Sequence, residues 1–296
     1  MNDVALGVDD ATGRDVVMAA TRGCGVRVYD AATRALVRVI GRNRGVGDAA
    51  LAYGVFGGGG VTGVAVHDGR VYAVDGDNHR VQVFSLATGV FERAFGTRGS
   101  GDGQFSYPWG VAVDDARVYV SDSVNDRVCV FDTATGKWVG AFGVRGSGDG
   151  QLSYPRGLAL DGDELFVADA FNHRVSVWRV DGGDCGGERN VVVGTWVRHI
   201  GAGVAGSDNG QLNWPCGVAV CGARVHVADT ENHRVCEFDR ATGAFVRACG
   251  GVQRGAGDGE FDTPWGIAAR ADGRRVYVAD TDNHRVQVWG WQFSAQ

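Results

Sequence analysis

Short apolar segments recur along the chain, and most of them end in an aspartate. Examples are VYAVD at 71–75, VYVSD at 118–122 and LFVAD at 165–169. A polar loop follows each of these segments, then a second apolar run such as RVQVF at 80–84 and a third such as ERAFG at 92–96. Segments of this length, rich in Val and aromatic residues and without a 3.6-residue period, predict β-strands rather than helices.

These segments belong to a repeat. All four prolines fall in one register, in YPWG, YPRG, WPCG and TPWG at 107–110, 154–157, 214–217 and 263–266. The arginine that opens the second run stands at 80, 127, 174, 234 and 285, so the steps are 47, 47, 60 and 51 residues. A copy without proline begins at Val61, and another is placed at Ala5. Four short strands in a unit of this length are typical of a β-propeller blade.

Six units predict an all-β fold, a six-bladed β-propeller of four-stranded antiparallel blades that forms one domain over residues 1–296. The residues just before each aspartate, or before Ala20 in the first unit, are mostly small, which suits the convergence of blades on the axis: Ala19, Val74, Ser121, Ala168, Ala228 and Ala279. The expected blades cover approximately residues 1–45, 61–98, 107–145, 154–203, 214–252 and 263–296.

Two places depart from the repeat. The last unit ends in RVQVWGWQFSAQ, without the Thr-Gly turn that precedes the outer strand elsewhere. We therefore expect an incomplete last blade with a poor fourth strand, or a chain that is part of something longer. The segment VDGGDCGGERN at 180–190 is an insertion between strands three and four of blade four. It is expected on the face opposite the loops between strands two and three, as a surface loop or as a second contact.

The loops after strand two are the most distinctive part of the repeat. They read DGDNHRVQVF, DSVNDRVCVF, DAFNHRVSVW, DTENHRVCEF and DTDNHRVQVW, and upstream of them stand GDGQF-like segments and the prolines. With this context the chain resembles the NHL-repeat family over nearly its whole length, strongly in units two to six and poorly in the first. The resemblance implies a propeller used mostly as a binding platform. Some members belong to tripartite-motif ubiquitin ligases, some bind RNA, and a related group are peptide-amidating lyases; the fold alone selects none of these.

In these loops the aspartate and the arginine are expected to form a structural pair. The aspartate can accept backbone N–H groups, Asn tolerates a left-handed backbone, and the arginine can reach the carboxylate across the hairpin or from the adjacent blade. In the first unit Ala20 and Gly25 replace both, whereas in the third Asp126 replaces only the histidine. The histidine is therefore expected to be an optional partner. The predicted pairs are Asp75 with Arg80, Asp122 with Arg127, Asp169 with Arg174, Asp229 with Arg234, and Asp280 with Arg285.

Neither the histidines nor the Gly-rich segments predict a metal site. His79, His173, His233 and His284 belong to four different blades, and a zinc ion needs its nitrogen ligands around one point. The segments at 99–105, 146–152, 206–212 and 255–261 each hold one or two acids, too few for an EF-type calcium loop. They are expected to cross from one blade to the next. We expect no metal and no cofactor.

The crossings and the loops after strand two should share one face of the ring. A ligand is expected to contact the positions that differ between repeats, above all those between Pro and Gly. The candidate binding residues are Thr62, Trp109, Arg156, Phe171, Cys216 and Trp265. Two tryptophans and an arginine at one opening match the composition of interaction hot spots, although the tryptophans could instead plug the channel.

Composition narrows the classes of partner. The chain carries 29 basic and 35 acidic residues, a net charge of -6, so it has no overall attraction to nucleic acid or to anionic membranes. No stretch resembles a membrane span or a signal peptide, which favours a cytoplasmic location. Seven cysteines without a CxxC pair argue against a disulfide framework. His67, His199 and His226 fall on separate elements and predict no shared catalytic centre.

We therefore expect a monomeric, non-catalytic scaffold that binds a protein or a peptide on one face of the propeller. The first alternative is a metal-dependent lyase or hydrolase, peptide-amidating-lyase-like or lactonase-like, with its site in the central channel. The second is an RNA-binding or ubiquitin-ligase-associated module of the same family.

Overall fold

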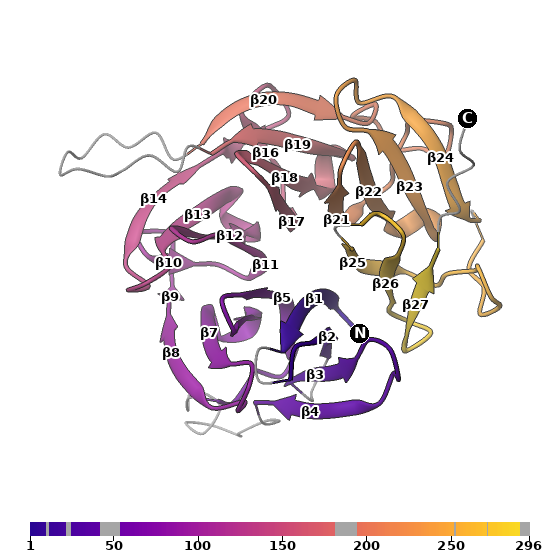
Figure 1. The fold of residues 1–296 in the computed structure, drawn as a ribbon. Coiled ribbons are helices and arrows are strands. Elements are labelled where there is room, and N and C mark those ends of the chain that lie inside the picture. The colour runs from indigo at the N-terminus through magenta and orange to yellow at the C-terminus, as the bar shows by residue number, and fades with distance from the viewer. Residues whose placement is uncertain are drawn as a thin grey trace.

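The structure is a computed structural model, and it describes residues 1–9, 12–21, 25–41, 54–180, 194–251, 253–270 and 272–290. Across these ranges, six antiparallel sheets stand around a central axis like the blades of a propeller (Figure 1). The predicted fold class is confirmed. The expected insertion at 181–190 and the expected poor strand at 291–296 lie outside the described residues.

Each blade runs from an inner strand beside the axis to an outer strand at the rim (Figure 1). Blades one to three contain β1 (Asp3–Asp9), β2 (Arg14–Thr21), β3 (Gly25–Asp30), β4 (Leu36–Ile40); β5 (Val61–His67), β6 (Arg70–Asp75), β7 (Arg80–Ser85), β8 (Phe91–Phe95); and β11 (Pro108–Val113), β12 (Arg117–Asp122), β13 (Arg127–Asp132), β14 (Trp138–Phe142). Blades four to six contain β17 (Pro155–Asp161), β18 (Glu164–Asp169), β19 (Arg174–Arg179), β20 (Thr195–Ile200); β21 (Pro215–Cys221), β22 (Arg224–Asp229), β23 (Arg234–Asp239), β24 (Phe245–Gly250); and β25 (Pro264–Ala269), β26 (Val276–Asp280), β27 (Arg285–Trp289).

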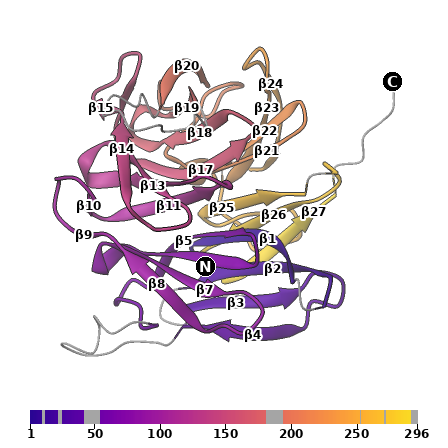
Figure 2. The same cartoon turned by 60° about the vertical axis from the view of Figure 1, so that its left-hand side comes forward.

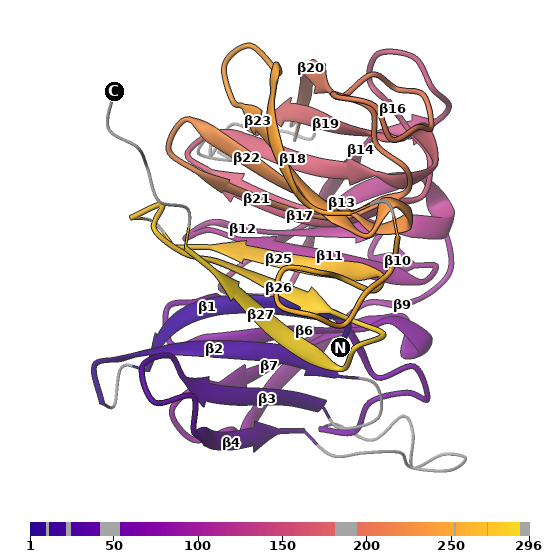
Figure 3. The same cartoon turned by 90° about the vertical axis from the view of Figure 1, so that its right-hand side faces the viewer.

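Blade six has three strands within the described residues, as the ending of the last unit predicted. The ring nevertheless closes, because blade six lies beside blade one (Figures 2 and 3). The hydroxyl of Thr281 donates to the carbonyl of Met1 at 2.6 Å. On the other side of β1, the side-chain amide of Asn2 donates to the carbonyl of Val61 in blade two at 2.8 Å.

The core lies between the blades rather than in one central mass. Between blades two and three, for example, Tyr72, Val83, Phe105, Val118 and Phe131 are all buried in one cluster. Because both faces of an inner blade strand are covered by neighbouring blades, both faces of these strands are apolar. Apolar and polar residues therefore alternate only weakly along each strand.

The glycine two positions after each proline allows the inner strands to approach one another. A Cβ atom on Gly110 would lie 2.4 Å from the carbonyl oxygen of Arg156, and one on Gly217 would lie 2.2 Å from that of Trp265. Any side chain at these positions would collide with the backbone of the next blade. The P-x-G pattern in the sequence is therefore a consequence of crowding at the axis.

Short loops join the blades on the face that carries the site. In the crossing to blade three, β9 (Thr97–Arg98) pairs in parallel with β10 (Gln104–Phe105), and in the next crossing β15 (Val144–Arg145) pairs with β16 (Gln151–Leu152). A single 3-10 turn follows strand two in blades two to five: η2 (Gly76–Asn78), η3 (Ser123–Asn125), η4 (Ala170–Asn172) and η5 (Thr230–Asn232).

Candidate functional site: the aromatic cluster at the channel mouth

The aspartate after strand two organises the loop around it. In blade three, Asp122 is fully buried, and its Oδ1 accepts the backbone N–H of Ser106 at 2.6 Å. Its Oδ2 accepts the side-chain amide of Asn125 at 2.7 Å and the Nε–H of Arg127 at 2.9 Å. Arg127 in turn donates to the carbonyls of Gly101 and Gln104 at 3.0 and 2.9 Å. One carboxylate thus holds its own hairpin and the crossing that enters the blade.

The same arrangement occurs in all five blades that carry the loop sequence. The Arg Nε to Asp Oδ2 distances are 2.9 Å for Asp75–Arg80, 2.9 Å for Asp122–Arg127, 2.8 Å for Asp169–Arg174, 2.6 Å for Asp229–Arg234 and 2.8 Å for Asp280–Arg285. Burial raises the pKa of the Asp122, Asp169 and Asp229 carboxyls, because desolvation outweighs their hydrogen bonds.

The histidine of the loop makes a contact that its sequence position did not suggest. His79 Nδ1 accepts the backbone N–H of Tyr107 at 3.1 Å, which joins blade two to blade three. His173 accepts from Trp214 at 3.2 Å and His233 from Thr263 at 3.1 Å, each across a blade boundary. In blade three Asp126 replaces the histidine, and its Oδ1 accepts the N–H of Tyr154 at 2.8 Å. The histidine is therefore an inter-blade acceptor for which aspartate can substitute.

The backbone of the loop also differs from the sequence interpretation, in which Asn takes the left-handed position. The histidine or Asp126 takes it instead, with φ between 51° and 54° at His79, Asp126, His173, His233 and His284. Asn125 lies within the 3-10 turn, where its side chain bonds Asp122 and the carbonyl of Gly99. Its side chain therefore links two segments rather than relieving backbone strain.

Four of the predicted binding residues meet at the mouth of the channel. Trp109 of blade three and Trp265 of blade six lie with ring centroids 5.2 Å apart, although two blades lie between them in the chain. The Arg156 guanidinium carbon lies 4.1 Å from the centroid of Trp109 and 5.6 Å from that of Trp265. Arg156 also donates to the Cys216 sulfur at 3.5 Å. This packing matches the alternative in which the tryptophans fill the channel opening.

The other two predicted residues lie apart from this contact. Thr62 donates its hydroxyl hydrogen to the carbonyl of Pro108 at 3.1 Å and links two inner strands. Phe171 is 48 % exposed and stands on the loop η4. Its ring stacks on Tyr154 at 4.8 Å and meets Trp214 edge-on at 5.0 Å. Phe171 therefore continues the aromatic surface outward from the mouth.

Sequence reasoning missed the residues directly before the prolines. Tyr154 and Trp214 have their ring centroids 5.3 and 5.4 Å from the guanidinium of Arg156. Both have positive φ, 55° and 52°. The signal was present in the sequence, because an aromatic residue precedes Pro in three of the four copies. We call Trp109, Tyr154, Arg156, Phe171, Trp214 and Trp265 the channel-mouth cluster.

Arg156 is the unusual member of this cluster. It is 7 % exposed, and among the described residues no carboxylate lies within ion-pair distance of it. Its buried Nε–H also has no hydrogen-bond partner there. The surrounding ring faces stabilise the charge by cation–π attraction. The cluster thus places an unpaired positive charge just beneath an aromatic surface.

The remaining histidines named from the sequence do not meet. His67 lies 2.9 Å from Asp115, His199 lies 3.5 Å from Asp149, and His226 lies 3.9 Å from Glu237, each in a different blade. Within the described ranges, no three His, Cys, Asp or Glu side chains gather in a way that could hold a metal ion. Among the described residues, no helix has the length and the apolar character that a membrane-spanning helix needs.

Comparison with known proteins agrees with the geometry. The sequence profile of the NHL repeat matches residues 60–84, 105–131, 152–178 and 261–289. The RING finger protein nhl-1 of Caenorhabditis elegans is 46 % identical over 79 residues, which are 26 % of this chain and 8 % of that protein.

Solved structures share the fold at low identity. The β-propeller domain of Cps50 (Swd1) from Myceliophteria thermophila has a TM-score of 0.62 at 12 % identity, over 98 % of both chains. Hydrazine synthase of Kuenenia stuttgartiensis matches with a TM-score of 0.61 at 13 % identity, over 98 % of this chain and 95 % of that one. A protein of unknown function from Bacteroides thetaiotaomicron matches with a TM-score of 0.65 at 17 % identity, over 97 % of this chain and 68 % of that one. The chain therefore carries four NHL repeats within a six-bladed β-propeller.

Proposed function

We propose that this chain is a non-catalytic binding module that holds a protein or peptide on the channel-mouth cluster. The observation that carries the proposal is the aromatic surface around Arg156. Its rings Trp109, Tyr154, Trp214 and Trp265 are half-buried, and Phe171 at its edge is 48 % exposed. A contiguous apolar surface on a soluble protein marks an interaction site more often than a single exposed residue does.

The chemistry of the cluster suits a protein ligand. Large aromatic rings supply contact area with few rotatable bonds, and tryptophan, tyrosine and arginine are enriched among residues that dominate interfaces. Arg156 lacks an anionic partner in the described part of the chain, so a ligand carboxylate or carbonyl that approaches the mouth would meet an uncompensated charge. The aromatic rings of the cluster would hold such a ligand by packing, and the guanidinium of Arg156 would hold it by its charge. The use of NHL propellers as binding platforms supports this proposal by analogy.

The test is capture of a partner from a cell extract, followed by cross-link mapping onto the propeller. Phe171→Ser and Trp109→Ala are expected to reduce capture by about tenfold or more, the usual effect at an interface hot spot. Val90→Ser is the matched control, because Val90 is 61 % exposed in the turn before β8, on the opposite face. Thermal melting of each variant checks the fold. Equal capture by all variants, or equal loss in Val90→Ser, would contradict the proposal.

A further inference from the structure

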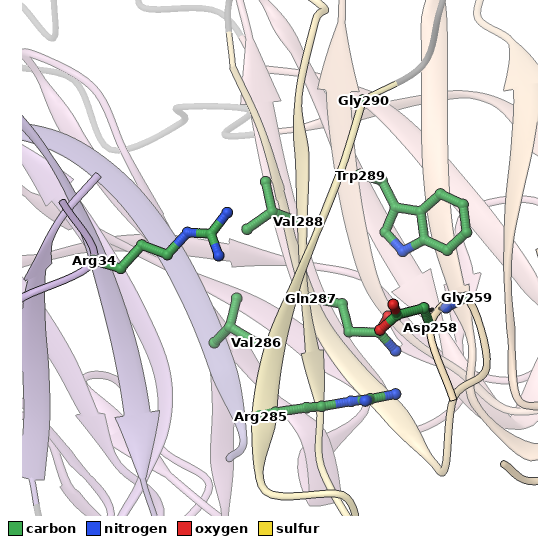
Figure 4. A pocket seen from close by; sticks show the side chains of 9 residues that line it. All are labelled: Arg34, Asp258, Gly259, Arg285, Val286, Gln287, Val288, Trp289 and Gly290. Atoms are coloured by element: carbon green, nitrogen blue, oxygen red, sulfur yellow. Dashed lines mark hydrogen bonds between the residues drawn. The ribbon is translucent and has the colours of Figure 1, made fainter. Parts of the chain in front are cut away.

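Arg156 differs from the arginines that open strand three of the blades. Each of those bonds the aspartate of its own loop. Arg285 is representative, because its Nε–H donates to Asp280 at 2.8 Å and its Nη2 donates to the carbonyl of Gly257 at 2.7 Å. Its side chain extends toward the crossing that holds Asp258 (Figure 4). Arg156 has no comparable set of acceptors in the described part of the chain.

The Arg156 guanidinium uses few of its N–H groups. Its Nη1 donates to the Cys216 sulfur at 3.5 Å, and its buried Nε–H has no partner among the described residues. Nη2 makes no hydrogen bond in these ranges either, but it is not one of the buried unpartnered atoms, so it stays accessible. A guanidinium in this state would gain from an acceptor that arrives from outside the chain.

The rings around this guanidinium shape the site. Their centroids lie between 4.1 and 5.6 Å from its central carbon, and they belong to Trp109, Tyr154, Trp214 and Trp265. The buried Nε1–H of Trp214 is a second donor without a partner within the described residues. Phe171 meets Trp214 edge-on at 5.0 Å and is half exposed beside it. The site therefore combines a cation, an indole donor and apolar walls.

Acids also stand on this face, and they oppose a negative ligand. Those of the Gly-rich crossings lie at the rim, as Asp102 does, because the adjacent Gly103 approaches Trp138 of the outer strand β14. Others stand on the loops after strand two, at the inner ends of the crossings and at the start of β1. Apart from the loop aspartates that bond arginine, these acids are, among the described residues, Asp3, Asp77, Asp126, Glu231, Asp262 and Asp282.

Three of these carboxylates are already engaged. Asp3 accepts the N–H of Val64 at 2.9 Å, and burial raises its pKa to about 7, so it is only partly charged at neutral pH. Asp126 accepts the N–H of Tyr154 at 2.8 Å. Asp262 accepts the hydroxyl of the following threonine at 3.1 Å. Hydrogen bonds of this kind spread the negative charge that these groups present to a ligand.

Glu231 is the exposed acid whose influence on the site is clearest. Burial raises the pKa of the Cys216 thiol, and of the two charges that act on it Arg156 lowers that pKa whereas Glu231 raises it. Glu231, Asp77 and Asp282 are exposed, so they act mainly through water. There a charge interaction is about fourfold weaker than beside a partly buried group. These acids therefore reduce the attraction of Arg156 for a single negative charge, and they oppose a dianion more strongly.

We propose that the channel-mouth cluster receives a carboxylate of the bound peptide, which Arg156 holds while a neighbouring apolar residue of the peptide packs on Phe171. The inference rests on the proposed function and names the group that this surface recognises. The planar guanidinium matches the two oxygens of a carboxylate, and the rings around it keep water away from the pair. The carboxylate can belong to an Asp or Glu side chain or to the end of the partner chain.

The test titrates the full chain with three short peptides. These are acetyl-Phe-Glu-amide, its neutral counterpart acetyl-Phe-Gln-amide, and acetyl-Gln-Phe with a free carboxyl terminus. Tryptophan emission measures the affinity, and the indole N–H resonance of Trp214 locates the bound peptide. We expect saturable binding of at least one acid, and about tenfold weaker binding of the neutral peptide. The stronger of the two acids identifies the source of the carboxylate. Inorganic phosphate should compete more weakly than either acid.

Variants assign the preference to one side chain. Arg156→Gln should abolish it, because the charge is lost at similar size, whereas Arg156→Lys should retain part of it. Arg145→Gln is the matched control, since the Arg145 side chain is 88 % exposed on a crossing and the change in net charge is the same. It should leave the preference unchanged. Glu231→Gln should strengthen the binding of the acids by about twofold. Thermal melting checks each fold, and Arg156→Lys decides the question if Arg156→Gln unfolds.

Four results would overturn the inference: no binding of either acid, equal binding of the acids and the neutral peptide, stronger binding of phosphate, or equal weakening by Arg156→Gln and Arg145→Gln. The proposed function fails by a different result, in which Phe171→Ser leaves partner capture unchanged. If Phe171→Ser abolishes capture and Arg156→Gln does not, the surface binds its partner without a carboxylate. In that case the proposed function stands and only the present inference fails.

Discussion

His173 of blade four accepts the backbone N–H of Trp214 of blade five through its Nδ1, at 3.2 Å. The bond fixes Trp214, which precedes Pro215. The φ of Trp214 is 52°, a value that is disfavoured for a residue before proline. We predict that His173→Gly lowers the free energy of unfolding by about 1–2 kcal/mol, because it removes the acceptor but keeps the left-handed backbone accessible. His173→Asn, which retains a side-chain oxygen, should cost less. Chemical denaturation of both variants measures the difference.

The control for this comparison already exists in the chain. Asp126 makes the equivalent bond to Tyr154 at 2.8 Å, so His173→Asp should be close to wild type at neutral pH. If the Gly, Asn and Asp variants unfold at the same denaturant concentration, the inter-blade bond contributes nothing.

The same contact makes stability depend on pH. Burial lowers the pKa of His79 and His173 below the ordinary value of 6.5. Below pH 6.5 the unfolded chain therefore binds more protons than the folded one, and stability decreases as pH falls through that value. A protonated Nδ1 also cannot accept the amide hydrogen. Melting temperatures from pH 8 to pH 5 should fall less steeply in the double variant His79→Asp, His173→Asp than in wild type. If the melting temperature depends on pH equally in both proteins, groups other than His79 and His173 determine that dependence.

Much of the fold could be predicted because the sequence repeats the same local pattern several times. Each copy of the apolar run, the loop and the Pro-x-Gly segment specifies one blade, and six copies specify a ring. The partner of the histidine could not be predicted in this way. Its bond joins the loop of one blade to the crossing of the next, and one repeat considered alone contains no such neighbour.

The candidate site shows the same division. Sequence variation between copies singled out Trp109, Arg156 and Trp265, and the structure brings these three together. It did not indicate that Arg156 would be enclosed by rings, because Trp109 and Trp265 meet only when the ring closes. Sequence variation also did not single out Tyr154 and Trp214, which precede two of the prolines and whose rings lie near Arg156 in the structure.

Asp229 should be required for folding rather than for any particular activity. It is fully buried and accepts hydrogen bonds from Asn213, Asn232 and Arg234 at 2.6, 2.8 and 2.6 Å. Asp229→Ala leaves the charge of Arg234, itself 6 % exposed, without its partner. We expect a loss of about 3–5 kcal/mol in the free energy of unfolding. Calorimetry or denaturant titration would measure it.

Asp102→Ala is the matched control for that experiment, because Asp102 is exposed on a crossing and the change in net charge is identical. It should change stability by less than about 0.5 kcal/mol. A folded Asp229→Ala protein of normal stability that failed to capture the partner would show instead that this carboxylate serves binding.

Gly110 tests whether crowding at the axis fixes the P-x-G pattern. A Cβ atom there would lie 2.4 Å from the carbonyl oxygen of Arg156 and 3.0 Å from the Cα of Gly157, both backbone atoms of the next blade. Two inner strands would have to separate, and overpacking of this kind costs about 1–3 kcal/mol. Because Trp109 is adjacent, Gly110→Ala should also shift the tryptophan emission of the folded protein.

Gly251→Ala provides the comparison, since a Cβ at Gly251 would come no closer than 3.9 Å to its neighbours. Its unfolding midpoint and emission should match those of wild type. Equal stability of Gly110→Ala and Gly251→Ala would mean that the inner strands can move apart without cost. In that case the glycines of the P-x-G pattern would not be explained by the close approach of the blades. The packing of Trp109 against Trp265 would then not depend on that close approach either.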